Sequence, residues 1–159
     1  MYRFDIIAVG RLPDDFVAEG CREFVKRLSP YASVNVTELP HVRLNSETPA
    51  DIAAAIDGEQ ERILAAIPRG SVVVAMCIEG KERSTEEFSD FLRERSMSGQ
   101  SRFTFIIGGS HGLGERVKSS ADLRMSMSRL TFTHGFARLM LLEQLYRAIS
   151  IQNNLKYHK

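Results

Sequence analysis

The stretch Arg-Met-Ser-Met-Ser-Arg-Leu-Thr-Phe-Thr-His, residues 124–134, joins a glycine-rich segment to a long apolar segment. Two methionines alternate with two serines over residues 125–128, which is the period of a short strand. An arginine, hydroxyl groups and His134 follow at the point where a helix should begin. A strand end that leads polar groups toward a helix start predicts a place for a ligand.

Outward from this stretch, strand patterns alternate with helical patterns along the chain. Strands are predicted at residues 4–9, 34–37, 71–78, 103–107 and at the stretch that begins at residue 124. Helices are predicted to begin after Pro13, at Thr48 and at Ser84, with a short helical stretch ending at residue 121 and a last helix over about 135–151. This alternation predicts a single α/β domain over residues 1–159, with a mostly parallel sheet flanked by helices.

The composition is typical of a soluble domain. Of the 159 residues 43% are hydrophobic, which is enough to bury a core. Cys21 and Cys77 lie far apart among apolar residues, so we expect them in the core and not in a zinc or dithiol site. The sequence has no leader pattern and no apolar run long enough to span a bilayer. We therefore expect a cytoplasmic protein with no membrane contact and no metal.

Charge is distributed unevenly along the chain. The whole sequence carries 21 basic and 20 acidic residues, which argues weakly against a general nucleic-acid binder. Residues 116–159 hold eight basic and two acidic residues, a net of +6, whereas residues 1–115 hold 13 basic and 18 acidic residues, a net of −5. This asymmetry predicts either that the C-terminal third meets an anionic partner or that opposite faces of two subunits attract each other.

The last predicted helix is apolar on nearly every side. Few polar residues interrupt its leucines and aromatic residues, and two of these, Glu143 and Arg147, have the i,i+4 spacing of an ion pair. A helix that is apolar all round is normally buried all round, and a small sheet covers only one side. The pattern therefore predicts a homodimer that packs through this helix.

Three features are candidates for chemistry. Gly108 and Gly109 end a predicted strand, and they suit either a tight structural turn or a loop that approaches a ligand closely. Their spacing is not that of a dinucleotide or P-loop motif. His134 and Arg138 share one face of the last helix; we interpret them as a pair directed at a polar substrate, although a helix-terminal histidine beside a solvated arginine has the same pattern.

The third feature is the polar C-terminal tail, residues 152–159, which contains Tyr157 and His158. A tail this short is normally frayed, and fraying is the simplest expectation for both side chains. Four scattered histidines do not make a metal site, and no Ser/His/acid or Cys/His arrangement has supporting context.

Motifs in the final third carry a family resemblance. They are Phe-Ile-Ile-Gly-Gly-Ser-x-Gly-Leu (105–113), Met-Ser-x-Leu-Thr-Phe-x-His (127–134), Leu-x-Glu-Gln-Leu-Tyr-Arg-Ala (141–148) and the terminal Tyr-His-Lys (157–159). Residues 103–159 closely resemble the RlmH family, small SPOUT-class methyltransferases that act on 23S ribosomal RNA. The earlier residues and the total length also fit.

The resemblance implies a fold and an activity beyond what the residue patterns indicate. Members are expected to have a C-terminal trefoil knot, which general topology rules disfavour. They bind S-adenosylmethionine (SAM) in the knot and work as homodimers. They methylate N3 of a pseudouridine in the helix 69 loop of 23S rRNA, on the assembled 70S ribosome.

By the same resemblance, family residues map onto positions of this chain. The implied cofactor contacts are Met76, Gly108, Met127, Ser128, Arg129, Leu130, Thr131 and Phe132. The implied catalytic residues are His134, Arg138, Tyr157 and His158. Thr133 stands where the family usually has proline; a threonine can cap the following helix, so we expect only a small change in loop stiffness.

The expected mechanism needs few protein groups. The protein has to hold the methyl group in line with the attacking nitrogen and help remove the N3 proton. His134 or His158 could take that proton, Arg138 or Arg129 could steady charge on the uracil oxygens, and Tyr157 could stack on the base from the other subunit. The competing hypotheses are a non-catalytic ribosome-associated module and a SAM or nucleotide enzyme with a small-molecule substrate.

Overall fold

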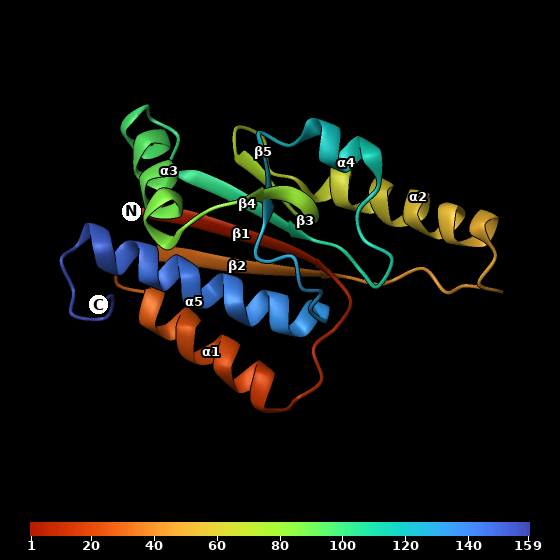
Figure 1. The fold of residues 1–159 in the computed structure, drawn as a ribbon, viewed down its shortest axis with the longest axis horizontal. Coiled ribbons are helices and arrows are strands. Elements are labelled where there is room, and N and C mark those ends of the chain that lie inside the picture. Colours follow the sequence, from red (N-terminus) through yellow and green to blue (C-terminus); the bar gives the residue numbers. More distant parts are fainter.

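The computed structural model describes residues 1–159, whose five strands form one sheet in the order β2-β1-β4-β3-β5 (Figure 1). Every pair of neighbouring strands is parallel, which confirms the predicted parallel sheet. The strands are β1 (Tyr2–Val9), β2 (Ala32–Leu39), β3 (Val72–Glu82), β4 (Arg102–Ile107) and β5 (Leu123–Ser126).

Five helices cover the two faces of this sheet. They are α1 (Phe16–Leu28), α2 (Pro49–Ala66), α3 (Thr85–Met97), α4 (Glu115–Ser120) and α5 (His134–Gln152). Helices α1, α3 and α5 lie on one face, whereas α2 and α4 lie on the other (Figure 1). The result is a three-layer α/β arrangement, as the alternation of elements predicts.

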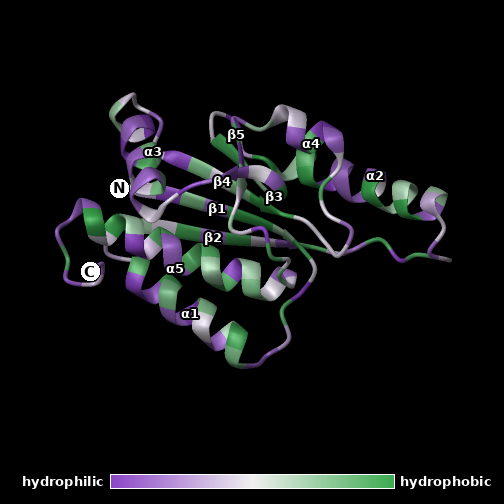
Figure 2. Ribbon diagram, in the orientation of Figure 1, coloured by the Kyte–Doolittle hydropathy of each residue, from purple (hydrophilic) through white to green (hydrophobic).

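The strands supply two cores because successive side chains point to opposite faces. In β1, Phe4, Ile6 and Ala8 join the larger core beneath α1, α3 and α5, while Ile7 and Val9 join the smaller core beneath α2 and α4. The other central strands alternate in the same way, and the sheet is the most hydrophobic part of the ribbon in Figure 2.

The helix starts predicted from sequence are confirmed by their caps. The Thr48 hydroxyl accepts a hydrogen bond from the backbone N–H of Asp51 at 3.2 Å, with proline at the first helical position. Ser84 and Glu87 form a complete capping box at the start of α3. Thr133 caps α5 through the N–H of Phe136 at 3.4 Å, as expected of the residue that replaces proline.

The edge between β3 and β5 differs from the prediction. β3 continues past residue 78 to Glu82, and its pairing with β5 jumps in register between Met76 and Lys81. At Gly80 the two segments nearly touch, because a Cβ there would lie only 2.6 Å from the carbonyl carbon of Met125. Glycine is the residue that allows this approach. The knotted threading of the C-terminal chain stays a prediction.

Helix α5 is covered largely within one chain. It lies over the sheet between α1 and α3, and Leu141, Leu142 and Leu145 are fully buried (Figure 1). The apolar pattern of α5 therefore does not by itself require a second subunit, because two neighbouring helices cover the sides that the sheet leaves open. The homodimer stays a prediction. No helix in the structure combines the length and hydropathy needed to cross a membrane.

The basic C-terminal third is largely neutralised within the fold. Five of its eight cations form ion pairs with carboxylates, most of them from the acidic part of the chain: Arg116 with Glu61, Lys118 with Glu79 and Glu115, Arg129 with Glu82, Arg138 with Glu38, and Arg147 with Glu143. The charge asymmetry along the sequence therefore reflects internal pairing to a large extent, and it is a weaker sign of an anionic partner than the sequence alone indicates.

Candidate functional site

A cavity of about 550 Å³ opens at the carboxyl ends of β3, β4 and β5. Its walls come from three segments far apart in sequence: residues 76–79 after the buried part of β3, residues 107–113 after β4, and residues 125–134 between β5 and α5. Its volume falls in the range of pockets that hold small molecules, and the carboxyl edge is where parallel α/β sheets bind ligands. The predicted ligand position at residues 124–134 is therefore part of a real cavity.

The glycine turn after β4 shapes one wall. Gly109 and Gly112 pair across a tight turn, in which the N–H of Gly112 donates to the carbonyl of Gly109 at 3.1 Å. A Cβ on Gly108 would lie 2.9 Å from the carbonyl carbon of Gly112, so a larger residue would force the turn apart. The turn thus needs glycine at Gly108 for its own packing, and it also brings backbone to the cavity surface.

The opposite wall is the loop between β5 and α5. The Ser126 hydroxyl donates to the carbonyl of Ser128 at 2.8 Å, and the Ser128 hydroxyl accepts from the N–H of Leu130 at 3.0 Å. The backbone N–H groups of Thr131 and Phe132 donate no hydrogen bond within the chain. The loop therefore offers free donors beside apolar side chains.

The structure brings together seven of the eight residues predicted to contact a cofactor. Those that line the cavity are Met76, Gly108, Met127, Ser128, Leu130, Thr131 and Phe132. Arg129 is the exception, because its side chain is 93% exposed and lies 3.9 Å from Glu82, outside the cavity. Arg129 stands between two lining residues because the loop backbone passes the cavity there, although its side chain lies outside. A sequence motif does not distinguish such a backbone position from a side-chain contact.

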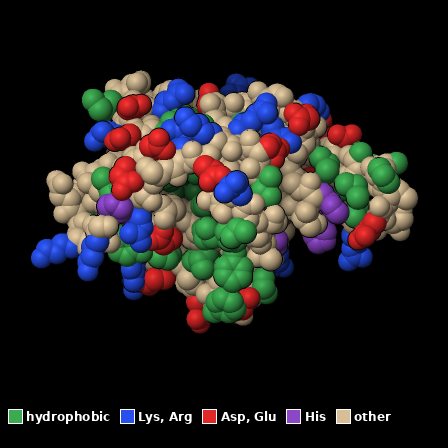
Figure 3. Space-filling view, in the orientation of Figure 1, with side chains coloured by type: hydrophobic (Ala, Val, Ile, Leu, Met, Phe, Trp, Pro, Cys, Tyr) green, Lys and Arg blue, Asp and Glu red, His purple; other side chains and the backbone are tan.

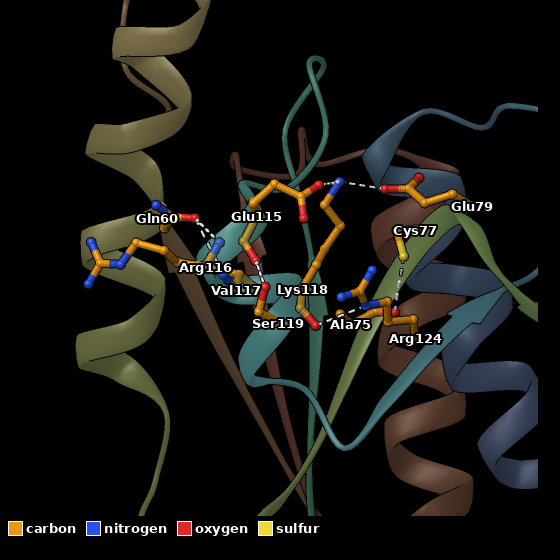
Figure 4. A network of polar contacts seen from close by, with 10 residues as sticks. All are labelled: Gln60, Ala75, Cys77, Glu79, Glu115, Arg116, Val117, Lys118, Ser119 and Arg124. Atoms are coloured by element: carbon orange, nitrogen blue, oxygen red, sulfur yellow. Dashed lines mark hydrogen bonds and ion pairs between the residues drawn. The ribbon is translucent and has the colours of Figure 1, made fainter.

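Charged groups that the sequence does not single out form one end of the cavity (Figure 4). Lys118 on α4 donates to Glu79 at 2.5 Å and lies 3.0 Å from Glu115, so two carboxylates surround its nearly buried ammonium group. The hydrogen bond from Lys118 lowers the pKa of Glu79, and the same contact raises the pKa of Lys118. Both groups are therefore ionised at neutral pH, and Arg124, which donates to the Lys118 carbonyl at 3.1 Å, balances the second carboxylate.

His134, the first residue of α5, also lines the cavity. Its ring packs on Gly10, whose φ of +108° is a conformation that favours glycine. Burial lowers the pKa of His134, and the positive charge of Arg138 lowers it further. The imidazole is therefore neutral at physiological pH, and it faces the space that the loop and the glycine turn enclose.

Arg138 is neither solvated nor directed into the cavity. Its side chain is buried, and its guanidinium donates to the carbonyl of Gly10 at 3.3 Å and to Glu38 at 3.4 Å. Neither interpretation of Arg138 from the sequence predicts this arrangement, because Gly10 follows β1 and Glu38 lies on β2, both at least 100 residues away in the chain. A direct contact with substrate stays a prediction that this geometry does not favour.

The C-terminal tail is held and not frayed. Tyr157 donates from its hydroxyl to Glu143 at 2.9 Å, and the Arg147 guanidinium stacks 4.6 Å from the centre of its ring. His158 lies 3.0 Å from Glu86 on α3. The predicted pair of Glu143 and Arg147 is confirmed at 2.5 Å, and it serves as the anchor of the tail.

The two groups of predicted catalytic residues lie at opposite ends of α5. His134 begins this 19-residue helix, and Tyr157 and His158 follow its end (Figure 1). The tail folds back along this helix: the Tyr157 hydroxyl is held by Glu143, nine residues from His134, which is roughly 14 Å at 1.5 Å per residue. Neither Tyr157 nor His158 lines the cavity of its own chain.

Besides these charged groups, Gly10 and Glu38 are not singled out as site residues by the sequence. In the sequence, Gly10 only follows the strand predicted over residues 4–9, and Glu38 only follows the strand predicted over residues 34–37. A glycine directly after a buried parallel strand is a usable signal, since it often marks close approach. Nothing in the local pattern of Glu38 points to Arg138.

Comparisons with known proteins agree with this architecture. A family model described as "Predicted SPOUT methyltransferase" matches residues 2–158. The chain is 44% identical over 155 residues to the "Ribosomal RNA large subunit methyltransferase H" of Carboxydothermus hydrogenoformans, covering 97% of this chain and 98% of the relative. A protein of the same name from Listeria monocytogenes serovar 1/2a is 41% identical over 155 residues, again with 97% and 98% coverage.

A solved structure shows the same fold at much lower sequence similarity. "The structure of a probable methylase family protein from Haemophilus influenzae Rd KW20" superposes with a TM-score of 0.51 and 12% identity, covering 99% of this chain and 70% of that one. Because the family match and the full-length relatives span the whole sheet and every wall of the cavity, the protein belongs to the SPOUT methyltransferase family.

Proposed function

We propose that the protein is a SAM-dependent methyltransferase that modifies large-subunit ribosomal RNA, at N3 of a pseudouridine in the helix 69 loop of the assembled ribosome. The observation that carries this proposal is the cavity at the ends of β3, β4 and β5, because the segments predicted to hold SAM meet there. Its full-length relatives bear names of large-subunit ribosomal RNA methyltransferases. Ribosomes as substrate are consistent with a cytoplasmic enzyme.

The cavity residues fit SAM chemically. Met76, Leu113 and Met127 offer apolar surface for a flat adenine, and the free N–H groups of Thr131 and Phe132 can donate to its ring nitrogens or to ribose oxygens. The Glu79 carboxylate in the cavity lining suits the ammonium group of the methionine portion or the ribose hydroxyls. The sulfonium of SAM supplies a methyl group together with its own leaving group, so no protein nucleophile is required.

The chain has to position the acceptor nitrogen and accept its proton. His134 faces the cavity and holds a neutral imidazole there. His158 is the second imidazole that could take the N3 proton, and Tyr157 could stack on the exposed base. Both belong to the tail, which contacts Glu143 and Glu86 and does not line the cavity of the same chain.

We infer that two copies of the chain complete one site, so that the tail of one copy meets the cavity of the other. Apolar side chains gather at the lower centre of the face seen in Figure 3, where α1 and α5 lie. Phe16 and Phe136 are 68% and 43% exposed, with ring centres 6.1 Å apart, and Phe132 from the cavity wall is also exposed. This patch beside the cavity is a surface that a homodimer would bury.

Methyl transfer to purified ribosomes tests the proposal. The protein is incubated with labelled SAM and either ribosomes that lack the modification or free 23S RNA, and the methylated nucleoside is mapped by mass spectrometry. We expect label at one pseudouridine and a preference for ribosomes, since a small chain with a net charge of only +1 gains recognition from the assembled particle. No label in either substrate would contradict the proposal.

Calorimetry with SAM separates this function from a non-catalytic ribosome-associated module. We expect saturable binding of SAM to the free protein. Binding of ribosomes without SAM binding would favour the non-catalytic alternative.

A further inference from the structure

The ring of His134 is held in one place by parts of the fold that do not touch the cavity. A Cβ added to Gly10 would lie 3.0 Å from Cε1 and 3.1 Å from Nε2 of the imidazole, so the ring rests directly on the glycine backbone. The N–H of Gly10 donates to the carbonyl of Leu39 at 2.8 Å. The ring therefore packs on backbone that is tied to the end of β2.

The two ring nitrogens have different surroundings. Nδ1 of His134 is buried and has no hydrogen-bond partner, whereas Nε2 is not buried and the residue lines the cavity. A buried N–H without an acceptor is rarer in proteins than a buried acceptor without a donor. We therefore assign the hydrogen of the neutral ring to Nε2, where the cavity or water can accept it.

Charged groups around the ring come from two elements and one loop. Arg138 lies one helical turn further along α5, Glu38 ends β2, and His41 follows in the next loop. The Arg138 guanidinium holds both Glu38 and the Gly10 carbonyl, and Glu38 also accepts from the N–H of Leu12 at 2.9 Å. Glu38 thus ties Arg138 to the loop that carries Gly10, on which the imidazole rests.

We propose that His134 serves methyl transfer as a neutral hydrogen-bond donor, from Nε2 to a carbonyl oxygen of the uracil ring, and that Glu38 is a positioning residue that acts through Arg138. The inference rests on the proposed function. As the N3–C bond forms and the sulfur–methyl bond breaks, the sulfur keeps the electron pair. The N3 proton leaves to another base, His158 of a second copy, and His134 stabilises the negative charge that develops on the oxygen.

Imidazole nitrogen NMR of the free, uniformly ¹⁵N-labelled protein tests the donor assignment without any turnover. At neutral pH we expect the His134 signals of a neutral ring with hydrogen on Nε2, assigned by their loss in His134→Gln. A hydrogen on Nδ1, or a charged ring at neutral pH, would overturn the assignment. This result stands even if the protein fails to methylate ribosomes, which would reject the proposed function instead.

Two substitutions of the same residue separate a donor from a base in kinetics. Glutamine donates a hydrogen bond but cannot take up the proton, and phenylalanine does neither. We expect His134→Gln to keep kcat within about tenfold of the wild type and His134→Phe to lose about 100-fold or more. SAM affinity is measured for both as a check of folding. Equal and complete loss in the two variants would show that His134 is the base.

The positioning role of Glu38 is tested by Glu38→Gln, which keeps an acceptor for Leu12 and Arg138 but removes the negative charge. We expect kcat to fall about threefold to tenfold while KM for SAM is unchanged, because the misplaced group contacts only the substrate. The same substitution in the His134→Phe background should have no further effect on kcat. An equal fall in both backgrounds would assign Glu38 a general structural role.

Discussion

Gly10 is the residue on which the geometry of His134 depends most directly. Its φ of +108° and the imidazole at 3.0 Å both exclude a side chain. Gly70 offers a matched control, because it also has a positive φ, +72°, but open space where a Cβ would lie.

We predict that Gly10→Ala destabilises the protein by about 1–3 kcal/mol and lowers methyl transfer, because the ring has to move. Gly70→Ala should cost stability by backbone strain alone and leave methyl transfer unchanged. Urea unfolding and the ribosome assay measure the two effects. Equal methyl-transfer activity of Gly10→Ala and Gly70→Ala would show that the reaction does not depend on the packing of the His134 ring on Gly10.

The depressed pKa of His134 predicts a pH dependence of stability. The unfolded chain binds a proton at this residue near pH 6.5, and the folded protein does so only at lower pH. The contribution of the neutral His134 ring to the free energy of unfolding is therefore fully present above about pH 6.5 and is lost as the pH falls toward the pKa of His134 in the folded protein. The wild type should lose more stability than His134→Gln between about pH 7.5 and 5.5 in urea titrations. A constant difference between the two proteins would contradict the depressed pKa.

At the residue scale, sequence alone identified most of the cavity but not the roles of its charges. Met127 and Phe132 were found because they belong to a contiguous motif. Arg138 was misjudged because burial against Glu38 is decided by contacts between distant segments, which no local pattern records.

Helix α4 shows how an element without a cap of its own is fixed in place. Gly114 precedes it and provides no side-chain cap, but the amide oxygen of Gln60 on α2 accepts from the N–H groups of Arg116 at 2.8 Å and Val117 at 3.3 Å (Figure 4). Because Lys118 projects from the same short helix into the end of the cavity, this buried amide connects α2 to the cofactor region.

We predict that Gln60→Leu destabilises the protein by about 1–2 kcal/mol, since two backbone donors lose their acceptor. SAM affinity should fall as well, because α4 carries Lys118 and follows the glycine turn. Gln60→Glu keeps an acceptor oxygen and is the control. Thermal unfolding measures the stability, and calorimetry measures the SAM affinity. Unchanged SAM affinity in Gln60→Leu would show that α4 does not shape the cavity.

At the element scale, the sequence was most informative where the controlling groups are local. The caps at Thr48 and Ser84 lie within four residues of the groups they bind, so their motifs predicted helix starts correctly. The extension of β3 to Glu82 depends on Gly80 approaching Met125, which follows 45 positions later. Its strand pattern ends earlier, so the extension could not be predicted from periodicity.

Across the whole molecule, α5 sets the separation of the two candidate halves of the site. Its start carries His134 beside the cavity, and its second half holds the tail through Glu143 and Arg147. The sequence motifs predicted both halves, and within one chain the tail residues do not line the cavity. The central claim is therefore that the cavity of one copy works with the tail of another.

Two variants each inactivate one half of the proposed shared site, either the tail or the cavity. Deletion of residues 157–159 removes the tail and should abolish methyl transfer while SAM binding remains nearly intact. Gly108→Val should abolish SAM binding, because its side chain would displace the backbone of Gly112. Each variant alone is expected to be inactive on ribosomes, and each should remain a folded dimer by circular dichroism and light scattering.

The most direct measurement is methyl transfer by a mixture of these two inactive variants after subunit exchange. In a random mixture half of the dimers contain one copy of each, and each mixed dimer has one intact cavity facing one intact tail, so we predict about a quarter of the wild-type activity. A mixture that exchanges subunits but stays as inactive as its components would contradict a site shared between two copies.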